Sequence, residues 1–65
     1  MYEDWMVAFQ YHEKDEGYRI SFYVVKAESI GEALQIADEQ ISNDFESKQW
    51  SDYHITGVNI IPELH

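Results

Sequence analysis

Cysteine is absent from this 65-residue chain, which contains one proline and three glycines. Without cysteine the chain has neither a disulfide nor a thiolate metal site. The glycines stand far apart, at positions 17, 31 and 57, so no glycine-rich loop is available to hold a phosphate group. No apolar run approaches the roughly 20 residues of a membrane-spanning helix. The sequence therefore predicts neither a disulfide-stabilised domain nor a membrane-spanning one.

Basic residues are also scarce, since four Lys and Arg stand against 13 Asp and Glu, which gives a net charge of −9. Charge of this sign repels phosphate backbones and anionic lipid headgroups, so we expect no direct binding of nucleic acid or of membranes. A basic protein surface is the expected partner. The first five residues, MYEDW, are acidic where a signal peptide is basic. We therefore expect a cytoplasmic protein, in the host cell if a phage encodes it.

Aromatic residues are abundant, at 15% of the chain, whereas disordered acidic sequences are poor in them. The chain is thus expected to fold, as a single small domain over residues 1–65. A domain of this size buries only about 60% of its unfolded surface, so its core is marginal. Oligomerisation is then the remaining common source of stability.

One segment, residues 29–45 (SIGEALQIADEQISNDF), has both a helical period and a start signal. Ser29 and Glu32 form a capping box at its beginning. An apolar stripe with 3.6-residue spacing follows and should pack on a sheet. The opposite side is acidic, except for Ile36, which is either an isolated exposed residue or a partner contact. The stripe comprises Ile30, Leu34, Ala37, Ile41 and Phe45, with Ala33 at its flank.

Three segments show the alternating apolar pattern of strands, namely residues 5–12, 18–26 and 53–61. The charged sequence EKDEG joins the first two and ends in a glycine, which predicts a hairpin turn. A four-residue loop places Tyr11 opposite Tyr18, and large apolar residues of both strands then share one face.

The third strand is ambiguous, because two pairs of apolar residues compete for its inward positions. We favour Val58 and Ile60 inward over Ile55 and Ile61, and Gly57 is a candidate for a bulge. The order of the elements is then β-β-α-β. It predicts a two-layer α+β domain with a three-stranded antiparallel sheet in the order 2-1-3 and one helix packed on one face.

One helix covers one face of such a sheet and leaves the other open. With the register given above, the open face holds an apolar patch, which we predict to be an oligomer interface or a partner surface. Its residues are Met6, Ala8, Tyr23 and Val25.

Residues able to do chemistry are few. The hairpin tip gathers a histidine and three carboxylates, but their spacing matches no calcium-binding loop, and a solvated turn explains them better. The histidines, at positions 12, 54 and 65, are far apart, and no Ser, His and Asp grouping can be formed from the sequence. We expect no enzyme activity, no cofactor and no metal site.

Acidity remains as the functional signal. Carboxylates held on a rigid scaffold can imitate a nucleic-acid backbone, so we predict a protein-binding module, of the kind phages and mobile elements encode, that inhibits a basic nucleic-acid-handling protein. The alternative is a small homodimeric structural protein whose charge serves only solubility. The predicted partner-binding residues are Glu28, Glu32, Ile36, Glu39 and Glu46 in and next to the helix, with Glu13, Asp15 and Glu16 in the hairpin.

Part of the chain resembles a known family. The hairpin sequence EKDEG followed by YRISFYVV, and then the pattern A-x-S-x-x-E-A-L-x-x-A from Ala27 to Ala37, resembles the front part of HicB-type antitoxins over roughly half of the chain. The resemblance implies an acidic protein that neutralises a basic RNA-cleaving toxin. The chain lacks the additional strand with a proline-rich segment, and the DNA-binding tail, found in that family.

Overall fold

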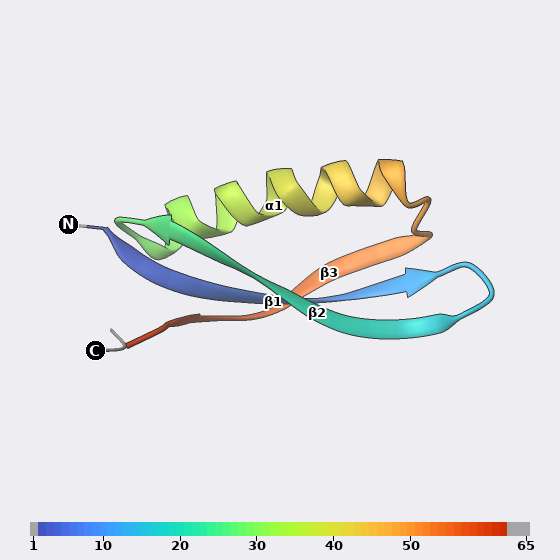
Figure 1. Ribbon diagram of the computed structural model, residues 1–65, viewed down its shortest axis with the longest axis horizontal. Helices are drawn as coiled ribbons and strands as arrows, with labels where there is room; N and C mark the ends of the chain where they lie inside the picture. Colours follow the sequence, from blue (N-terminus) through green and yellow to red (C-terminus); the bar gives the residue numbers. More distant parts are fainter. Residues whose placement is uncertain (1, 63–65) are drawn as a thin grey trace.

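The computed structural model describes residues 2–62 of the chain. Its elements are β1 (Glu3–Glu13), β2 (Gly17–Ala27), α1 (Ile30–Ser47) and β3 (Asp52–Ile60). The strands form one antiparallel sheet in the order β2-β1-β3, and α1 lies along one face of it (Figure 1). The predicted two-layer α+β fold with strand order 2-1-3 is therefore confirmed.

The turn between β1 and β2 is tighter than the sequence predicted. Glu13 already pairs with Gly17, so only residues 14–16 form the loop. The Glu16 N–H donates to the Glu13 carbonyl oxygen at 3.1 Å. Asp15 (φ 72°) and Gly17 (φ 85°) take left-handed conformations, which glycine adopts without steric cost and aspartate tolerates better than most residues. These two residues let the chain reverse early.

The earlier reversal makes the predicted hairpin register wrong by one residue. Tyr11 lies opposite Arg19 and not opposite Tyr18. Because side chains alternate between the two faces, a shift of one residue moves every side chain of β2 to the other face. The apolar pattern could not settle this, because both sets of alternating β2 residues contain large apolar side chains.

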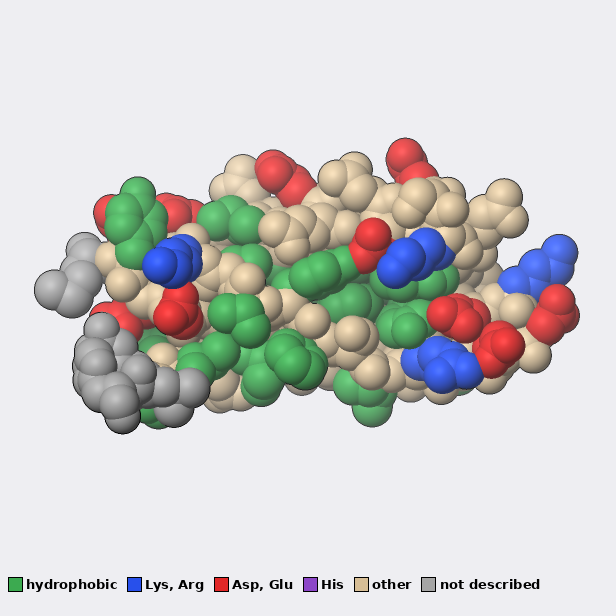
Figure 2. Space-filling view, in the orientation of Figure 1, with side chains coloured by type: hydrophobic (Ala, Val, Ile, Leu, Met, Phe, Trp, Pro, Cys, Tyr) green, Lys and Arg blue, Asp and Glu red, His purple; other side chains and the backbone are tan. Residues whose placement is uncertain are grey.

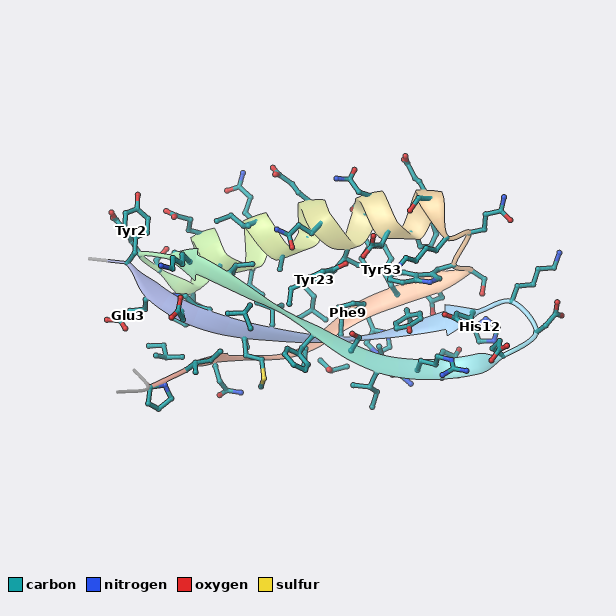
Figure 3. The ribbon with its side chains drawn as sticks, viewed as in Figure 1. Tyr2, Glu3, Phe9, His12, Tyr23 and Tyr53 are labelled. Atoms are coloured by element: carbon teal, nitrogen blue, oxygen red, sulfur yellow. The ribbon has the colours of Figure 1, made fainter. Side chains whose placement is uncertain are left out.

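Two of the predicted oligomer-interface residues consequently lie on the face that α1 covers. Val25 is buried in the core, and Tyr23 packs against it. Tyr23 stacks on Phe9, with ring centroids 5.3 Å apart. Figure 3 shows Phe9, Tyr23 and Tyr53 in the space between α1 and the sheet. The prediction that Tyr23 and Val25 lie on the uncovered face is thus wrong.

A register shift in the pairing of β1 with β3 resolves the ambiguity of the third strand. Ala8 pairs with Gly57 and the next residue, Phe9, pairs with Ile55, as expected for a bulge near Gly57. Ile55 and Val58 therefore both pack against the core. The inward position of Val58 is confirmed, whereas Ile55 was predicted to face outward and does not.

At the end of β3, Ile60 pairs with Trp5 and so belongs to the covered side, but it remains exposed. Ile60 thus lies on the predicted side of the sheet, but its side chain is not buried there.

The helix begins where the sequence predicted. Ser29 is its N-cap, and its Oγ accepts a hydrogen bond from the Glu32 N–H at 3.2 Å, which satisfies one of the free amides of the first turn. Its end lies at Ser47, beyond the predicted end at Phe45, and Lys48 closes the last turn. The buried helix residues, Ala33, Ala37 and Ile41, belong to the predicted stripe and its flank.

Two isoleucines of α1 depart from prediction. Ile36, predicted on the solvent side as a candidate partner contact, packs against the core, whereas Ile30 of the predicted stripe is exposed. The apolar side of α1 is therefore wider in its middle and shorter at its start than the sequence indicated.

Trp50 closes the core at the end of α1, although the sequence placed it only in a loop. It is buried and stacks on Tyr11, with ring centroids 4.1 Å apart. The Nζ of Lys48 lies 5.8 Å from the centre of the Trp50 ring, within reach of a cation–π attraction. At the other end of the core, the Trp5 indole N–H donates to the Ala27 carbonyl oxygen at 3.0 Å. The two tryptophans thus bracket the covered face.

Candidate functional site

The outer side of α1 carries an uncompensated row of carboxylates. The helix contains no Lys, Arg or His. Glu32, Glu39 and Glu46 are spaced by seven residues, which places them on nearly one line about 10 Å apart along the axis. In Figure 2 acidic side chains stand along the upper edge of the molecule, over α1. The complete set of carboxylates in the helix is Glu32, Asp38, Glu39, Asp44 and Glu46.

The predicted partner-binding residues of this region differ in exposure. Glu28, Glu39 and Glu46 are exposed, Glu32 is half-buried beside its cap, and Ile36 packs against the core. The carboxylates are thus available to a partner, whereas Ile36 contributes chiefly to the fold. Tyr53 ties one further helix carboxylate to the sheet, because its hydroxyl donates to Asp38 Oδ1 at 3.4 Å.

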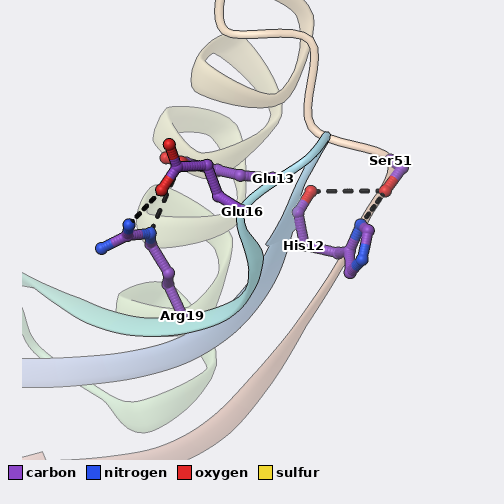
Figure 4. A network of polar contacts seen from close by, with 5 residues as sticks. All are labelled: His12, Glu13, Glu16, Arg19 and Ser51. Carbon is purple, nitrogen blue, oxygen red and sulfur yellow. Dashed lines mark hydrogen bonds and ion pairs between the residues drawn. The ribbon is translucent and has the colours of Figure 1, made fainter.

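The hairpin tip is less negative than its sequence suggests, because Arg19 reaches back to it. The Arg19 guanidinium lies 2.5 Å from Glu16 and 3.5 Å from Glu13, measured between the nearest nitrogen and oxygen atoms (Figure 4). The hydrogen bond with Glu16, followed by the charges of Glu16 and Glu13, raises the pKa of Arg19. Of the three predicted tip carboxylates, only Asp15 has no basic partner among the described residues.

The tip and α1 therefore do not form one continuous acidic surface. The hairpin turn extends beyond the end of the helix (Figure 1), and basic side chains lie among the acidic ones there (Figure 2). The residues predicted to bind a partner fall into two groups. Only the helix group lacks nearby cations on its own element.

The sequence did not predict a pair of contacts between His12 of β1 and Ser51, the residue before β3, which we call the clasp. The His12 Nδ1 lies 2.5 Å from Ser51 Oγ, and Ser51 Oγ donates to the His12 carbonyl oxygen at 3.3 Å (Figure 4). Which of the two atoms donates in the contact between Nδ1 and Oγ depends on the tautomer of the imidazole. The Ser51 N–H also donates to the His12 carbonyl oxygen, at 2.9 Å.

This clasp fixes the loop that carries Trp50. Nothing in the sequence spacing predicts it, because 39 residues separate His12 from Ser51 and only the register of β1 with β3 brings them together. Within residues 2–62, no three His, Asp or Glu side chains are grouped as metal ligands would be. His65, the remaining histidine, lies outside the described residues.

The uncovered side of the sheet is the second surface of interest. We call it the open face and define it by Met6 and Ala8 of β1 and by Tyr18, Ile20, Phe22 and Val24 of β2. The β2 side chains are strongly exposed, at 63%, 75%, 56% and 53% respectively. Met6 and Ala8, predicted for this side, lie directly opposite Val24 and Phe22. The open face is therefore more apolar than the sequence register indicated.

A scan against protein-family models, a search of curated proteins and a search of solved structures found no match to this chain. The resemblance to HicB-type antitoxins thus stays an expectation from the sequence. The part of the chain that the structure describes also contains no helix that is both long enough and apolar enough to cross a membrane. Two surfaces of the molecule, the outer side of α1 and the open face, are the candidate binding sites.

Proposed function

We propose that this protein is an acidic protein-binding module that engages a basic, nucleic-acid-handling protein through the outer side of α1. The observation that carries the proposal is the helix itself, which displays five carboxylates and no basic side chain. The charge of −9 makes nucleic acids and anionic membranes unfavourable partners.

The rigidity of the helix is what makes its charge useful for recognition. A packed helix fixes the backbone positions from which its carboxylates project, so a partner has to order only their side chains and not the chain that carries them. Buried Ala33, Ala37 and Ile41 hold α1 on the sheet and thereby present Glu39 and Glu46 outward. Fixed negative charges in a row attract a basic groove over a distance and increase the rate of association.

A row of this kind favours a partner that normally holds a nucleic-acid backbone. The carboxylates then occupy the positions of phosphates and prevent the partner from binding its nucleic acid. The protein acts in this way as an inhibitor, of the type that phages and mobile elements encode. A basic RNA-cleaving toxin, as the HicB-type resemblance implies, falls within this class of partner.

The test begins with the tagged protein as bait in a nuclease-treated cell extract, followed by identification of the captured proteins. We expect basic nucleic-acid-handling proteins that are released by salt and by added duplex DNA. For a captured protein, we expect the variant with both Glu32→Lys and Glu39→Lys to bind about tenfold more weakly or worse. The matched control carries Glu13→Lys and Asp15→Lys, which changes the net charge equally at the hairpin tip.

The control separates a defined surface from general acidity. A helix-specific interface predicts a much smaller loss of binding in the hairpin control than in the helix variant. Equal losses in both variants, or capture that neither salt nor DNA reverses, contradict the proposal. An empty capture combined with lower solubility of both variants supports the alternative, in which the charge serves solubility alone.

A further inference from the structure

The open face carries exposed apolar side chains in a continuous block. Cross-strand pairs join Met6 with Val24 and Ala8 with Phe22, and Gln10 lies opposite Ile20. Side chains that are directly opposite on one face of an antiparallel pair touch each other, so these residues form one patch and not scattered single positions. In Figure 2 hydrophobic side chains reach the surface along the lower side, over the strands and away from α1. Patches of this kind mark interaction sites.

The charge distribution separates this patch from the rest of the molecule. Along β1 and β2, the charged side chains of the open face are Asp4 and Lys26, which lie opposite each other at one end and have opposite signs. On β3 the register adds Asp52 at the other end of the face, opposite His12. The helix carboxylates project from the other layer. The centre of the open face is thus neutral in a chain with a net charge of −9.

This charge distribution favours a second copy of the same chain as the molecule that binds the open face. Two copies of so acidic a protein repel each other through most of their surface, and least where their neutral faces meet. Contact through the open faces places the two α1 helices on opposite outer sides, as far apart as the molecule allows. A basic partner, in contrast, is attracted to α1 and finds little complementary charge on the open face.

The size of the face also matches a dimer. The molecule measures 41 × 19 × 16 Å, so a rectangle around one long side covers roughly 650–780 Å², which sets an upper limit for the open face close to the ~800 Å² per partner of a standard stable interface. Two sheets that pack face to face lie about 10 Å apart and bury their facing side chains. The small core under α1 would gain a second apolar layer, which is a common solution for domains of this length.

We infer that the protein forms a symmetric homodimer in which the open faces of two copies pack against each other, with Ile20, Phe22 and Val24 in the contact. The dimer has four layers, with the helices outside and the two sheets inside. It presents two acidic helices in opposite directions. Self-association through the open face requires no basic partner, so it can be tested separately from the proposed function.

The test is sedimentation equilibrium of the full chain over a wide range of concentrations. We expect a reversible monomer–dimer equilibrium for the wild type. Phe22→Glu should weaken the dimer by about tenfold or more, because it places two carboxylates in a desolvated contact. Gln35→Glu adds the same charge on the outer side of α1 and should leave the equilibrium nearly unchanged. Circular dichroism of each variant checks that the fold is retained.

A second variant keeps the test decisive if Phe22→Glu fails to fold or acts only through net charge. Ile20→Lys reduces the negative charge of the protein and should still dissociate the dimer, because it places a cation in the same apolar contact. A wild type that remains monomeric at every concentration overturns the inference. A dimer that survives both substitutions also overturns it, because such a dimer uses another surface, for example the free edge of β2.

Discussion

The two faces of the sheet contain similar residues, but one face is buried under the helix and the other is exposed. On the covered face, Phe9 is 2% exposed, whereas Phe22 on the open face is 56% exposed. Both are phenylalanines in the middle of 11-residue strands that pair with each other. Apolar content alone therefore did not determine which face is buried. Backbone geometry at the turn and the close packing of the helix selected the buried face.

Small residues under the helix also help to determine which face of β2 is buried. Ala27 at the end of β2 is fully buried together with Ala33 and Ala37 of α1. Short side chains at these positions let the helix lie close to the sheet. The opposite register of β2 would place Lys26 under the start of the helix in place of Ala27. In that register Lys26 would lie opposite Glu3, and the desolvation of this pair under the helix would cost more than the burial of the Ala27 methyl group. The end of β2 therefore also disfavours the opposite register.

The largest expected effect contrasts the two phenylalanines. Phe9→Ala should destabilise the fold by about 3–5 kcal/mol, because it leaves a cavity in the core. That loss is comparable to the total stability of a small domain. Phe22→Ala should cost less than about 1 kcal/mol at dilutions where the chain is monomeric. Urea denaturation of both variants measures the contrast, and equal losses would show that the two faces are not distinct.

Neighbouring residues of β2 provide a contrast of intermediate size. Tyr23→Glu should destabilise the fold by about 2–4 kcal/mol, because it places a carboxylate beside Phe9 in the core. Val24→Glu should leave the stability of the monomer within about 1 kcal/mol. Thermal unfolding followed by near-ultraviolet circular dichroism compares them. The reverse order of stability would indicate the register that the sequence first suggested.

The smallest contrast concerns the turn that sets the register. Gly17→Ala should destabilise by about 1–2 kcal/mol, because alanine is strained at a φ of 85°. Gly57→Ala is the matched control, since no atom lies within 4 Å of an added Cβ there and its φ is outside the left-handed region. Denaturation midpoints measure both. A neutral Gly17→Ala would mean that the turn does not enforce the register.

Much of the fold was readable from the sequence, because strong local signals agreed with it. Ser29 and Glu32 marked the start of the helix, and alternating residues marked three strands. The β1–β2 register was not readable, because Phe22 and Val24 form as good an apolar set as Tyr23 and Val25. Deciding between the sets requires knowing that Asp15 adopts a left-handed conformation, which no pattern specifies.

The candidate site was predicted in part. The exposed carboxylates Glu39 and Glu46 follow directly from helical spacing, and the structure places them on the surface. The pairing of Arg19 with Glu13 and Glu16 depends on the register, so the sequence overestimated the negative charge of the tip. The clasp of His12 with Ser51 depends on a pairing between distant segments, which local patterns do not contain.

Both candidate surfaces depend on the register of β1 with β2, and a disulfide cross-link measures that register directly. The chain has no cysteine, so an introduced pair can form only one intramolecular disulfide. Met6 lies opposite Val24, and Cα atoms directly opposite each other in an antiparallel pair are ~4.5–5.5 Å apart, which a disulfide can span. The double variant Met6→Cys and Val24→Cys should therefore cross-link within one chain upon mild oxidation, as read by mass spectrometry. The double variant Met6→Cys and Tyr23→Cys should cross-link less readily. If it cross-links more readily than the first variant, the observed register is wrong, and Phe22 and Val24 lie beneath the helix.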